Sequence, residues 1–447
     1  MRITASILSA GLLAWSAPAV AVAQDAPVAA TPATGLAAES DVVAFRRLRA
    51  EGIAAAGADD LVTAGARLAA ADTRIPNHPG LILMRARVAA GAGDPATALA
   101  QVARYARAGL VFNLARDPAL SALADQPGYA AVAAAVEANR AAVGADRLSV
   151  LASIEGRGLV ESLVRDAPRQ RWLVSLVRDR TIVALDDAGG VSSFLAADAS
   201  IGGVLGLALD PEAGVLWAAA SPLPPSTQGL APDAPRLVPV LLKIDAASGS
   251  VLARYPAPDD GIERALGDVS RAADGTIYVA DGIAGDLFQL RPGDAALTPL
   301  LPGGTLGSPQ GMVVTPDGAA LIVVDYSSGL WRIDRSSGAA TRLAVPADAS
   351  LIGVDGLITD GRALYGLQNG VAPQRVLKLV PDAGWTRIVA VEVLAANLPA
   401  LDEPTTGLVE NGELVFVSRS QWSDFDGEGA LRTASPAPAL IARLRID

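Results

Sequence analysis

The chain has 447 residues, of which 51% are apolar and 19% charged, so it can bury a large core and form more than one domain. Its formal net charge of −11 argues against nucleic-acid or anionic-membrane partners, because either would require a basic surface to neutralise phosphate charge. It contains no cysteine, so it must be stable without disulfides even in an oxidising compartment.

The first 23 residues are predicted to be a secretory signal peptide. Arg2 is followed by the apolar run ILSAGLLAW, and the small residues AVA end at Ala23, which is the pattern of a cleavage site. A membrane anchor is the weaker alternative, because the run is shorter than the ~20 residues of a spanning helix. We expect a periplasmic or secreted protein without a membrane span. The Pro/Ala/Thr-rich residues 24–38 are expected to be a linker.

Residues 39–145 are predicted to form a small all-α domain. Apolar residues recur at three- and four-residue spacing in DLVTAGARLAAADTRI and PATALAQVARYARAGL, and Pro/Gly breaks such as IPNHPG separate the segments. His78, the only histidine, is expected to start a helix. The region resembles degenerate tetratricopeptide repeats, most of all from Leu81 to Ala108. One such helix pair cannot bury its apolar face alone, so the helices must pack as a unit or against the remainder of the chain.

Residues 147–447 change to short runs rich in Val, Ile, Leu, Trp and Tyr between Gly, Asp and Pro turns. A unit of about 40 to 50 residues with about four short strands recurs, which is typical of propeller blades. Six copies predict an all-β six-bladed β-propeller, and we expect the run at 148–154 to pair with the last sheet and close the ring. A pair of β-sandwiches is the alternative. The copies begin as GLVESLVRD (158–166), GVLGLALD (203–210), LGDVSR (266–271), PQGMVV (309–314), GVDGLIT (353–359) and PTTGLVE (404–410).

These copies resemble NHL-type propellers and, more specifically, the senescence-marker-protein/gluconolactonase family. In that family a divalent ion, usually calcium, is held at the central channel by a Glu, an Asn before Gly and an Asp, each at the start of an innermost strand. The matching residues here are Glu161, Gln310 in place of the Asn, and Asp355. A further Asn-Asp pair reads Gly267–Asp268. The resemblance therefore implies a calcium site with a changed middle ligand.

The residue types themselves agree with such a site. Carboxylates and amide oxygens suit Ca²⁺ or another hard divalent cation, whereas zinc and copper are disfavoured without cysteine or clustered histidine. The alternative is that Glu161, Gln310 and Asp355 only cap turns beside glycine. Asp281 and Asp325 are expected to bind backbone at strand ends. Ser-His-Asp catalysis in the propeller is excluded, because the single histidine lies in the helical region.

Two functions are compatible with these residues. The first is a calcium-dependent hydrolase of a lactone or related ester, in which the ion polarises the carbonyl and Asp355, or alternatively Asp268, takes a proton from the attacking water. The second is a non-catalytic binding or scaffold protein, in which the propeller and the helical repeats are interaction surfaces and the helical domain docks a protein partner.

Overall fold

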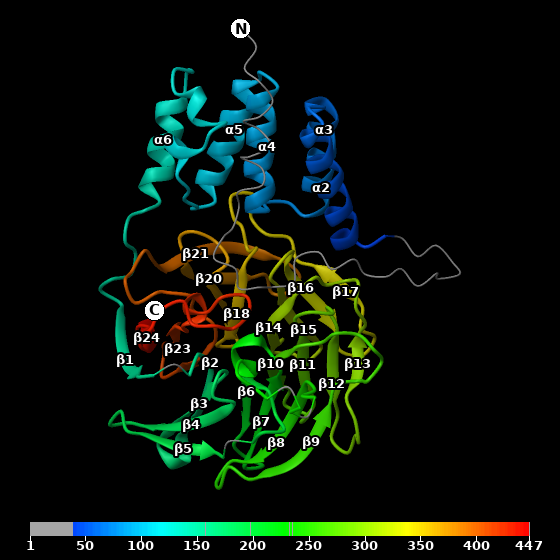
Figure 1. Cartoon of the computed structure of the whole chain (residues 1–447), viewed down its shortest axis with the longest axis vertical. Coiled ribbons are helices and arrows are strands. Elements are labelled where there is room, and N and C mark those ends of the chain that lie inside the picture. Colours follow the sequence, from blue (N-terminus) through cyan, green and yellow to red (C-terminus); the bar gives the residue numbers. More distant parts are fainter. Residues whose placement is uncertain (1–38, 157, 197, 232, 235, 447) are drawn as a thin grey trace.

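Six four-stranded antiparallel sheets form the larger part of the chain, and their innermost strands contact one another in a closed ring. The computed structural model describes residues 39–156, 158–196, 198–231, 233–234 and 236–446 (Figure 1). The predicted signal peptide and linker lie outside the described residues. The prediction of a six-bladed β-propeller preceded by a small helical region is confirmed.

The strands of each blade run in chain order from the axis outward, except in the last blade. Blade 1 contains β2 (Val160–Asp166), β3 (Arg171–Leu176), β4 (Thr181–Asp186) and β5 (Val191–Leu195), and blade 2 contains β6 (Gly203–Asp210), β7 (Val215–Ser221), β8 (Val240–Asp245) and β9 (Val251–Pro256). Blade 3 contains β10 (Leu266–Arg271), β11 (Ile277–Asp281), β12 (Leu287–Leu290) and β13 (Thr298–Leu301), and blade 4 contains β14 (Pro309–Val314), β15 (Ala320–Asp325), β16 (Gly329–Asp334) and β17 (Ala340–Arg342). Blade 5 contains β18 (Val354–Thr359), β19 (Leu364–Gln368), β20 (Arg375–Pro381) and β21 (Ile388–Ala396), and blade 6 contains β22 (Gly407–Glu410), β23 (Glu413–Arg419), β24 (Ala439–Arg445) and β1 (Leu148–Ile154).

The core lies between the blades. Six buried apolar clusters each join two adjacent blades. In β15, Leu321 and Val323 pack toward blade 3 while Ile322 and Val324 pack toward blade 5, because successive side chains of a strand point to opposite faces. A strand buried on both faces therefore reads as a continuous apolar run.

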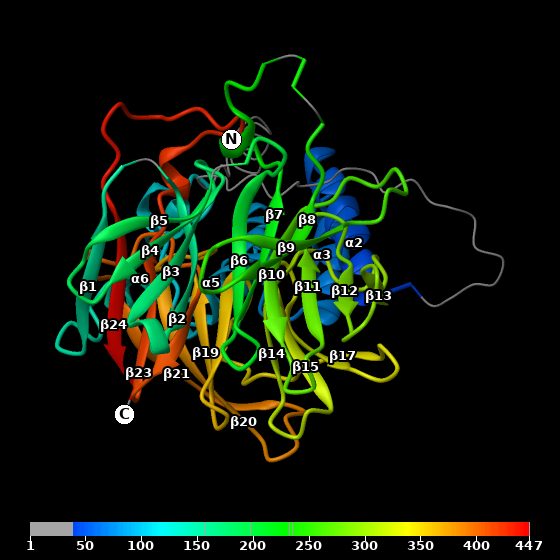
Figure 2. The same ribbon diagram turned by 90° about the horizontal axis from the view of Figure 1, so that it is seen from below.

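The ring is closed by the strand that precedes the first blade. Strand β1 pairs with β24 from Leu148↔Leu444 to Ile154↔Ala439, as predicted, and both lie at one side of the ring in Figure 2. The closing sheet therefore takes its strands from both ends of the propeller segment. This pairing leaves no open gap between blades 6 and 1, which share one apolar cluster.

The helical region consists of five α-helices, and short helical turns occur there and between the strands. His78 starts α4 as predicted, since its Nδ1 accepts a hydrogen bond from the Leu81 amide (3.3 Å). The elements are α2 (Asp41–Gly57), α3 (Leu61–Arg74), α4 (Pro79–Gly91), α5 (Pro95–Arg107), η1 (Leu114–Arg116), η2 (Ser121–Leu123), α6 (Tyr129–Ala138), η3 (Ala167–Arg169), α7 (Pro224–Thr227) and η4 (Trp422–Asp424). The pair α4/α5 corresponds to the tetratricopeptide-like pair expected from Leu81 to Ala108.

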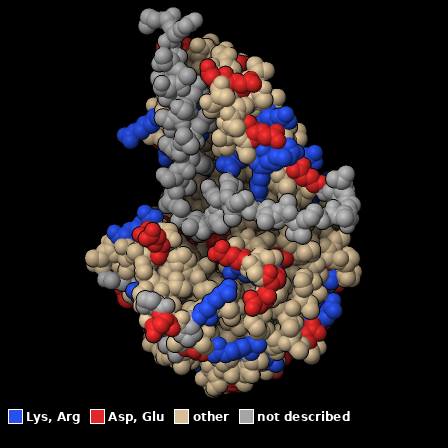
Figure 3. All heavy atoms as spheres, turned by 45° about the vertical axis from the view of Figure 1, so that its right-hand side comes forward, with Lys and Arg blue, Asp and Glu red and all other residues tan. Residues whose placement is uncertain are grey.

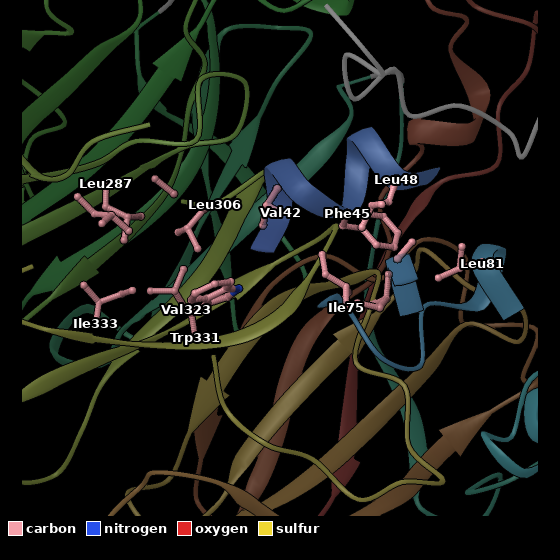
Figure 4. Packing of buried hydrophobic residues seen from close by; sticks show 14 of the residues in the cluster. Val42, Phe45, Leu48, Ile75, Leu81, Leu287, Leu306, Val323, Trp331 and Ile333 are labelled. Atoms are coloured by element: carbon pink, nitrogen blue, oxygen red, sulfur yellow. The ribbon is translucent and has the colours of Figure 1, made fainter. Parts of the chain in front are cut away.

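The helices pack on the propeller rather than standing apart from it. Val42, Phe45 and Ile75 belong to the same buried cluster as Leu306 and Trp331 of the propeller (Figure 4). Figure 1 shows the helices to one side of the ring, next to β16, β17, β20 and β21 of blades 4 and 5. The helical region therefore lies against the propeller at blades 4 and 5.

Charged side chains of both signs lie on the surface. Figure 3 shows acidic and basic side chains interspersed on the face in view, without a broad basic patch. Within the described part of the chain, no helix is both long enough and apolar enough to cross a membrane.

Candidate functional site in the central channel

The candidate site residues occupy one register position at the start of the innermost strands. Val160, Leu266, Pro309 and Val354 each pair with the last residue of the neighbouring strand, and the ladder is then interrupted. The residue after each of them sits at this interruption. In blades 1, 3, 4 and 5 these residues are Glu161, Gly267, Gln310 and Asp355. Leu205 and Thr406 hold the corresponding place in blades 2 and 6, each directly before a glycine.

The next position brings the innermost strands close to one another. A Cβ at Gly206 would collide with the backbone of Gly267 and Asp268, and one at Gly356 would collide with Thr405. Glycine therefore permits the close approach of adjacent strands. Blade 3 carries Asp268 at this same position, which places a carboxyl group against the axis.

Four carboxyl groups converge here from four blades. Burial, and then repulsion from Asp355, raises the pKa of Glu161 well above its ordinary value. Burial, and then repulsion from Asp268, does the same to the pKa of Asp355. Burial raises the pKa of Asp268 to about 7, and it also raises the pKa of Glu403 to about 7. Among the described residues no Arg or Lys forms an ion pair with any of the four.

Neutral donors orient two of the carboxylates. Glu161 Oε2 accepts a hydrogen bond from the indole Nε1 of Trp422 (2.6 Å), and Asp355 Oδ2 accepts one from the side-chain Nδ2 of Asn369 (2.7 Å). Neither carboxylate accepts a bond from a described backbone N–H, so the turn-capping alternative is not supported for them. The carboxyl of Asp268 makes no hydrogen bond with another described residue.

Gln310 shares the ring position of Glu161 and Asp355, but its amide is held on its own strand. Its Nε2 donates to Ser308 Oγ (3.1 Å), which in turn donates to the carbonyl of Gly282 (3.0 Å). This arrangement leaves the amide oxygen of Gln310 as the group that remains for a ligand.

Calcium was expected from the resemblance, and the donors fit it in type and charge. Carboxylate and amide oxygens without a counter-ion are what a hard divalent cation would neutralise. Within the residues that the structure describes, however, no three Asp, Glu, His or Cys side chains are close enough together to hold a metal ion. A calcium ion at this position would be held by two carboxylates and an amide, or would require the carboxylates to move toward it.

The carboxylates expected to be structural are structural. Asp281 Oδ1 accepts bonds from the amides of Ala265 (3.0 Å) and Ala284 (3.1 Å), and Asp325 accepts bonds from the amides of Ser308 (3.2 Å) and Ser327 (2.8 Å). Both predictions are confirmed.

Sequence reasoning missed three residues of the site, Asn369, Glu403 and Trp422. Glu403 directly precedes the sixth repeat copy, PTTGLVE. Its position next to this copy is the signal that could have identified it. Asn369 comes directly after β19 and Trp422 begins η4. Both lie in loops outside the repeated strand pattern, so nothing in the repeat pointed to them.

The fold and the channel thus define a six-bladed propeller with an acidic axial site. No protein-family model matches the chain, and a search of curated proteins found no match. Similar solved structures include a gluconolactonase from Xanthomonas campestris (14% identity, 68% of this chain and 91% of that one, TM-score 0.45). Others are the calcium-binding protein regucalcin from Agrobacterium tumefaciens (15%, 66% and 93%, 0.45) and a PQQ-bound aldose sugar dehydrogenase from Streptomyces coelicolor (14%, 67% and 98%, 0.46).

Proposed function

We propose that the chain is an exported, gluconolactonase-like hydrolase of a lactone or related ester that depends on a divalent cation, with Ca²⁺ the first candidate. The observation that carries this proposal is the convergence of Glu161, Asp268 and Asp355 from blades 1, 3 and 5, with no basic partner among the residues that the structure describes. Buried carboxyl groups with perturbed pKa values in a channel are typical of functional sites. The resemblance of the repeat copies to the lactonase family supports the reaction type.

Glu161 and Asp355 would hold the cation together with the amide oxygen of Gln310. A cation bound there would polarise the substrate carbonyl and stabilise the oxyanion that forms when water attacks. Trp422 and Asn369 keep one oxygen of each carboxylate in place through their hydrogen bonds, which leaves the second oxygen for the cation.

Asp268 is the better placed of the two proton acceptors. A pKa of about 7 matches a general base that works near neutral pH, and its carboxyl has no described hydrogen-bond partner to compete with water. As the water oxygen bonds to the carbonyl carbon, its proton passes to Asp268. When the ring C–O bond breaks, Asp268 returns that proton to the leaving alkoxide oxygen. Asp355 is the alternative base if it is not engaged by the cation.

The test uses the purified full chain after treatment with a chelator. We expect calorimetric titration to show one calcium site, which Glu161→Ala abolishes. We also expect the protein to hydrolyse an aldonolactone in a calcium-dependent reaction. The rate should fall by two or more orders of magnitude in Asp355→Ala or Asp268→Ala, as for loss of a general base or ligand. A wild-type chain that opens lactones no faster than Asp355→Ala would refute the hydrolase.

Export is part of the proposal, and it has its own test. The apolar run and the small residues before Gln24 support a cleaved signal peptide. Amino-terminal sequencing of the protein recovered from the periplasm or medium of a bacterial host should begin at Gln24. A cytoplasmic product that retains Arg2 would contradict it.

A binding protein is the second candidate, and two observations favour it. Gly267 and Gln310 depart from the family's Asn residues, and the helical region binds the loop that leads into Asp355. In this case the chain would bind a partner through its helical domain and would not turn over substrate. Calcium binding without hydrolysis of any lactone or ester tested, together with stoichiometric recovery of one periplasmic protein, would favour this second function.

A further inference from the structure

The helical region forms hydrogen bonds with two loops of blade 5. One loop leads into Asp355, and the other carries the hydrogen-bond donor of Asp355. The first loop, residues 349–353, leads directly into β18 and Asp355. The second, residues 369–374, begins with Asn369 and connects β19 to β20. Different residues of the helical region bind each loop.

The loop before Asp355 is held by Asn77, which lies between α3 and α4. Asn77 Nδ2 donates to the carbonyl of Ala349 (2.9 Å), and the hydroxyl of Ser350 donates to the carbonyl of Asn77 (2.8 Å). Asn77 is itself fixed, because Arg104 of α5 donates to its Oδ1 (2.8 Å). Asn77 and Ser350 are 7% and 1% exposed, so these bonds are shielded from competing water.

The loop after Asn369 is held by the end of α5. The Val111 amide donates to the carbonyl of Ala372 (2.7 Å). Arg375, 3% exposed, donates through Nη1 to the carbonyl of Ala108 (2.9 Å) and through Nε to Gln368 Oε1 (2.6 Å). Burial lowers the pKa of Arg375 to about 10, so it remains a cation at neutral pH, and the carbonyl at the helix C-terminus is a favourable partner for it.

Gln368 connects the two loops. Its Nε2 donates to the carbonyls of Ser350 (3.0 Å) and Ile352 (2.7 Å), and the Gly370 amide donates to the carbonyl of Gly353 (3.0 Å). The two loops are therefore joined by hydrogen bonds, and the helical region is bound to both of them.

Asn369 connects the second loop to the carboxylate of Asp355. Its Nδ2 bonds Asp355 Oδ2 (2.7 Å) and the carbonyl of Pro404 (3.1 Å), and its Oδ1 accepts from the hydroxyl of Tyr326 (3.0 Å). Because the carbonyl of Pro404 can only accept, the amide nitrogen must face it, and the same nitrogen then faces Asp355. The side chain has one orientation, in which it is a donor to the carboxylate.

We propose that Asn369 is a positioning residue for Asp355 and that the helical region sets this position by holding both loops. The helices are then part of the channel site rather than a separate module. Glu161 provides the contrast: its described bonds come from Trp422 and, at its carbonyl, from Thr405, both in the propeller. A change that weakens the bonds between the helical region and these loops should therefore alter the position of Asp355 and leave that of Glu161 unchanged.

A matched pair of variants tests the hold of the helical region in the full chain. Asn77 and Asn397 both have positive φ (60° and 53°), and each donates its side-chain amide across the boundary between helices and propeller at 2.9 Å. Glycine accepts this backbone conformation at either site. In hydrogen exchange with mass detection, Asn77→Gly should speed exchange of residues 349–359 and 368–375 by roughly fivefold or more, the equivalent of one hydrogen bond.

Asn397→Gly should leave exchange of both segments unchanged. If Asn77→Gly changes neither of them, or if both variants change them equally, the proposed hold is wrong. This measurement needs no bound cation and no activity.

The second arm measures calcium affinity by calorimetry and rests on the proposed function. Asn369→Ala should weaken binding by roughly tenfold, as for loss of a hydrogen bond to a charged group, and Asn77→Gly by less. Adding Asn77→Gly to Asn369→Ala should change affinity little further, because both act through one contact. Fully additive effects would overturn the role of Asn369. A wild-type chain that binds no calcium would reject the proposed function, and the exchange comparison would still decide the hold of the helices.

Discussion

Asp268 occupies a position that blades 2, 4, 5 and 6 give to glycine. A carboxyl there is costly, because burial disfavours its charged form and raises its pKa to about 7. The position therefore favours a chemical role for Asp268 over a structural one.

Replacing Asp268 by Asn should stabilise the cation-free protein at pH 8. The unfolded chain loses this proton near pH 4 and the folded chain near pH 7, so the wild-type free energy of unfolding falls as pH rises through this window and then levels off. Asp268→Asn removes that loss. It should therefore raise the free energy of unfolding by about 1 to 4 kcal/mol at pH 8 and change it very little at pH 4. Urea unfolding at both pH values in chelator measures it. The exposed Asp125→Asn is the control, and an equal effect at pH 4 and 8 would contradict the explanation.

The indole of Trp422 is the neutral donor to Glu161. Trp422→Phe keeps an aromatic ring but loses the 2.6 Å hydrogen bond, so the ionised carboxylate becomes less favourable. We expect calcium affinity to fall by roughly tenfold with little loss of folding stability, measured by calorimetry and thermal unfolding. Trp385→Phe, elsewhere in the propeller, should leave affinity unchanged.

At the scale of elements, the innermost strands show how much the sequence could reveal. The repeat copies were sufficient to place Glu161, Gln310 and Asp355 at one strand position, because register is determined by the pattern. The partners Asn369 and Trp422 could not be predicted in this way. They reach the channel from loops whose paths are set by long-range contacts, including those of the helices.

A pair of glycines tests the packing of the innermost strands. Gly356→Ala places a Cβ against the carbonyl of Thr405, whereas a Cβ at Gly267 meets nothing within 4 Å. We expect Gly356→Ala to destabilise the protein by about 2 kcal/mol or more, as in other overpacked cores. Gly267→Ala should stay within about 0.5 kcal/mol of wild type. Chemical denaturation of both variants decides it, and equal stability of the two would show that the strands can separate.

At the scale of the whole molecule, the helices and the propeller share one apolar cluster. The helical periodicity of residues 39–145 was visible in the sequence, but its docking surface was not, since apolar positions do not state which partner covers them. The cluster implies that the two regions unfold together, because separating them would expose core residues of both.

Tryptophan makes this cooperativity measurable. The described helical region has no Trp, while the propeller carries Trp172, Trp217, Trp331, Trp385 and Trp422. Fluorescence therefore reports the propeller and far-ultraviolet circular dichroism at 222 nm the helices. Leu306→Ala, at a residue 2% exposed, should lower the free energy of unfolding by about 2 to 5 kcal/mol and shift both midpoints together. The exposed Val62→Ala should leave both in place, and a shift of the fluorescence signal alone would show that the regions unfold independently.

The pairing of β1 with β24 also determines when the propeller ring can close during synthesis. During synthesis β1 appears first and its partner almost 300 residues later, so its hydrogen-bonding edge stays vacant while five blades are made. Such an edge invites association with other chains. Because the helices precede β1, they too emerge before the propeller surface that covers them, and a nascent chain must be kept from aggregating until its last strand arrives.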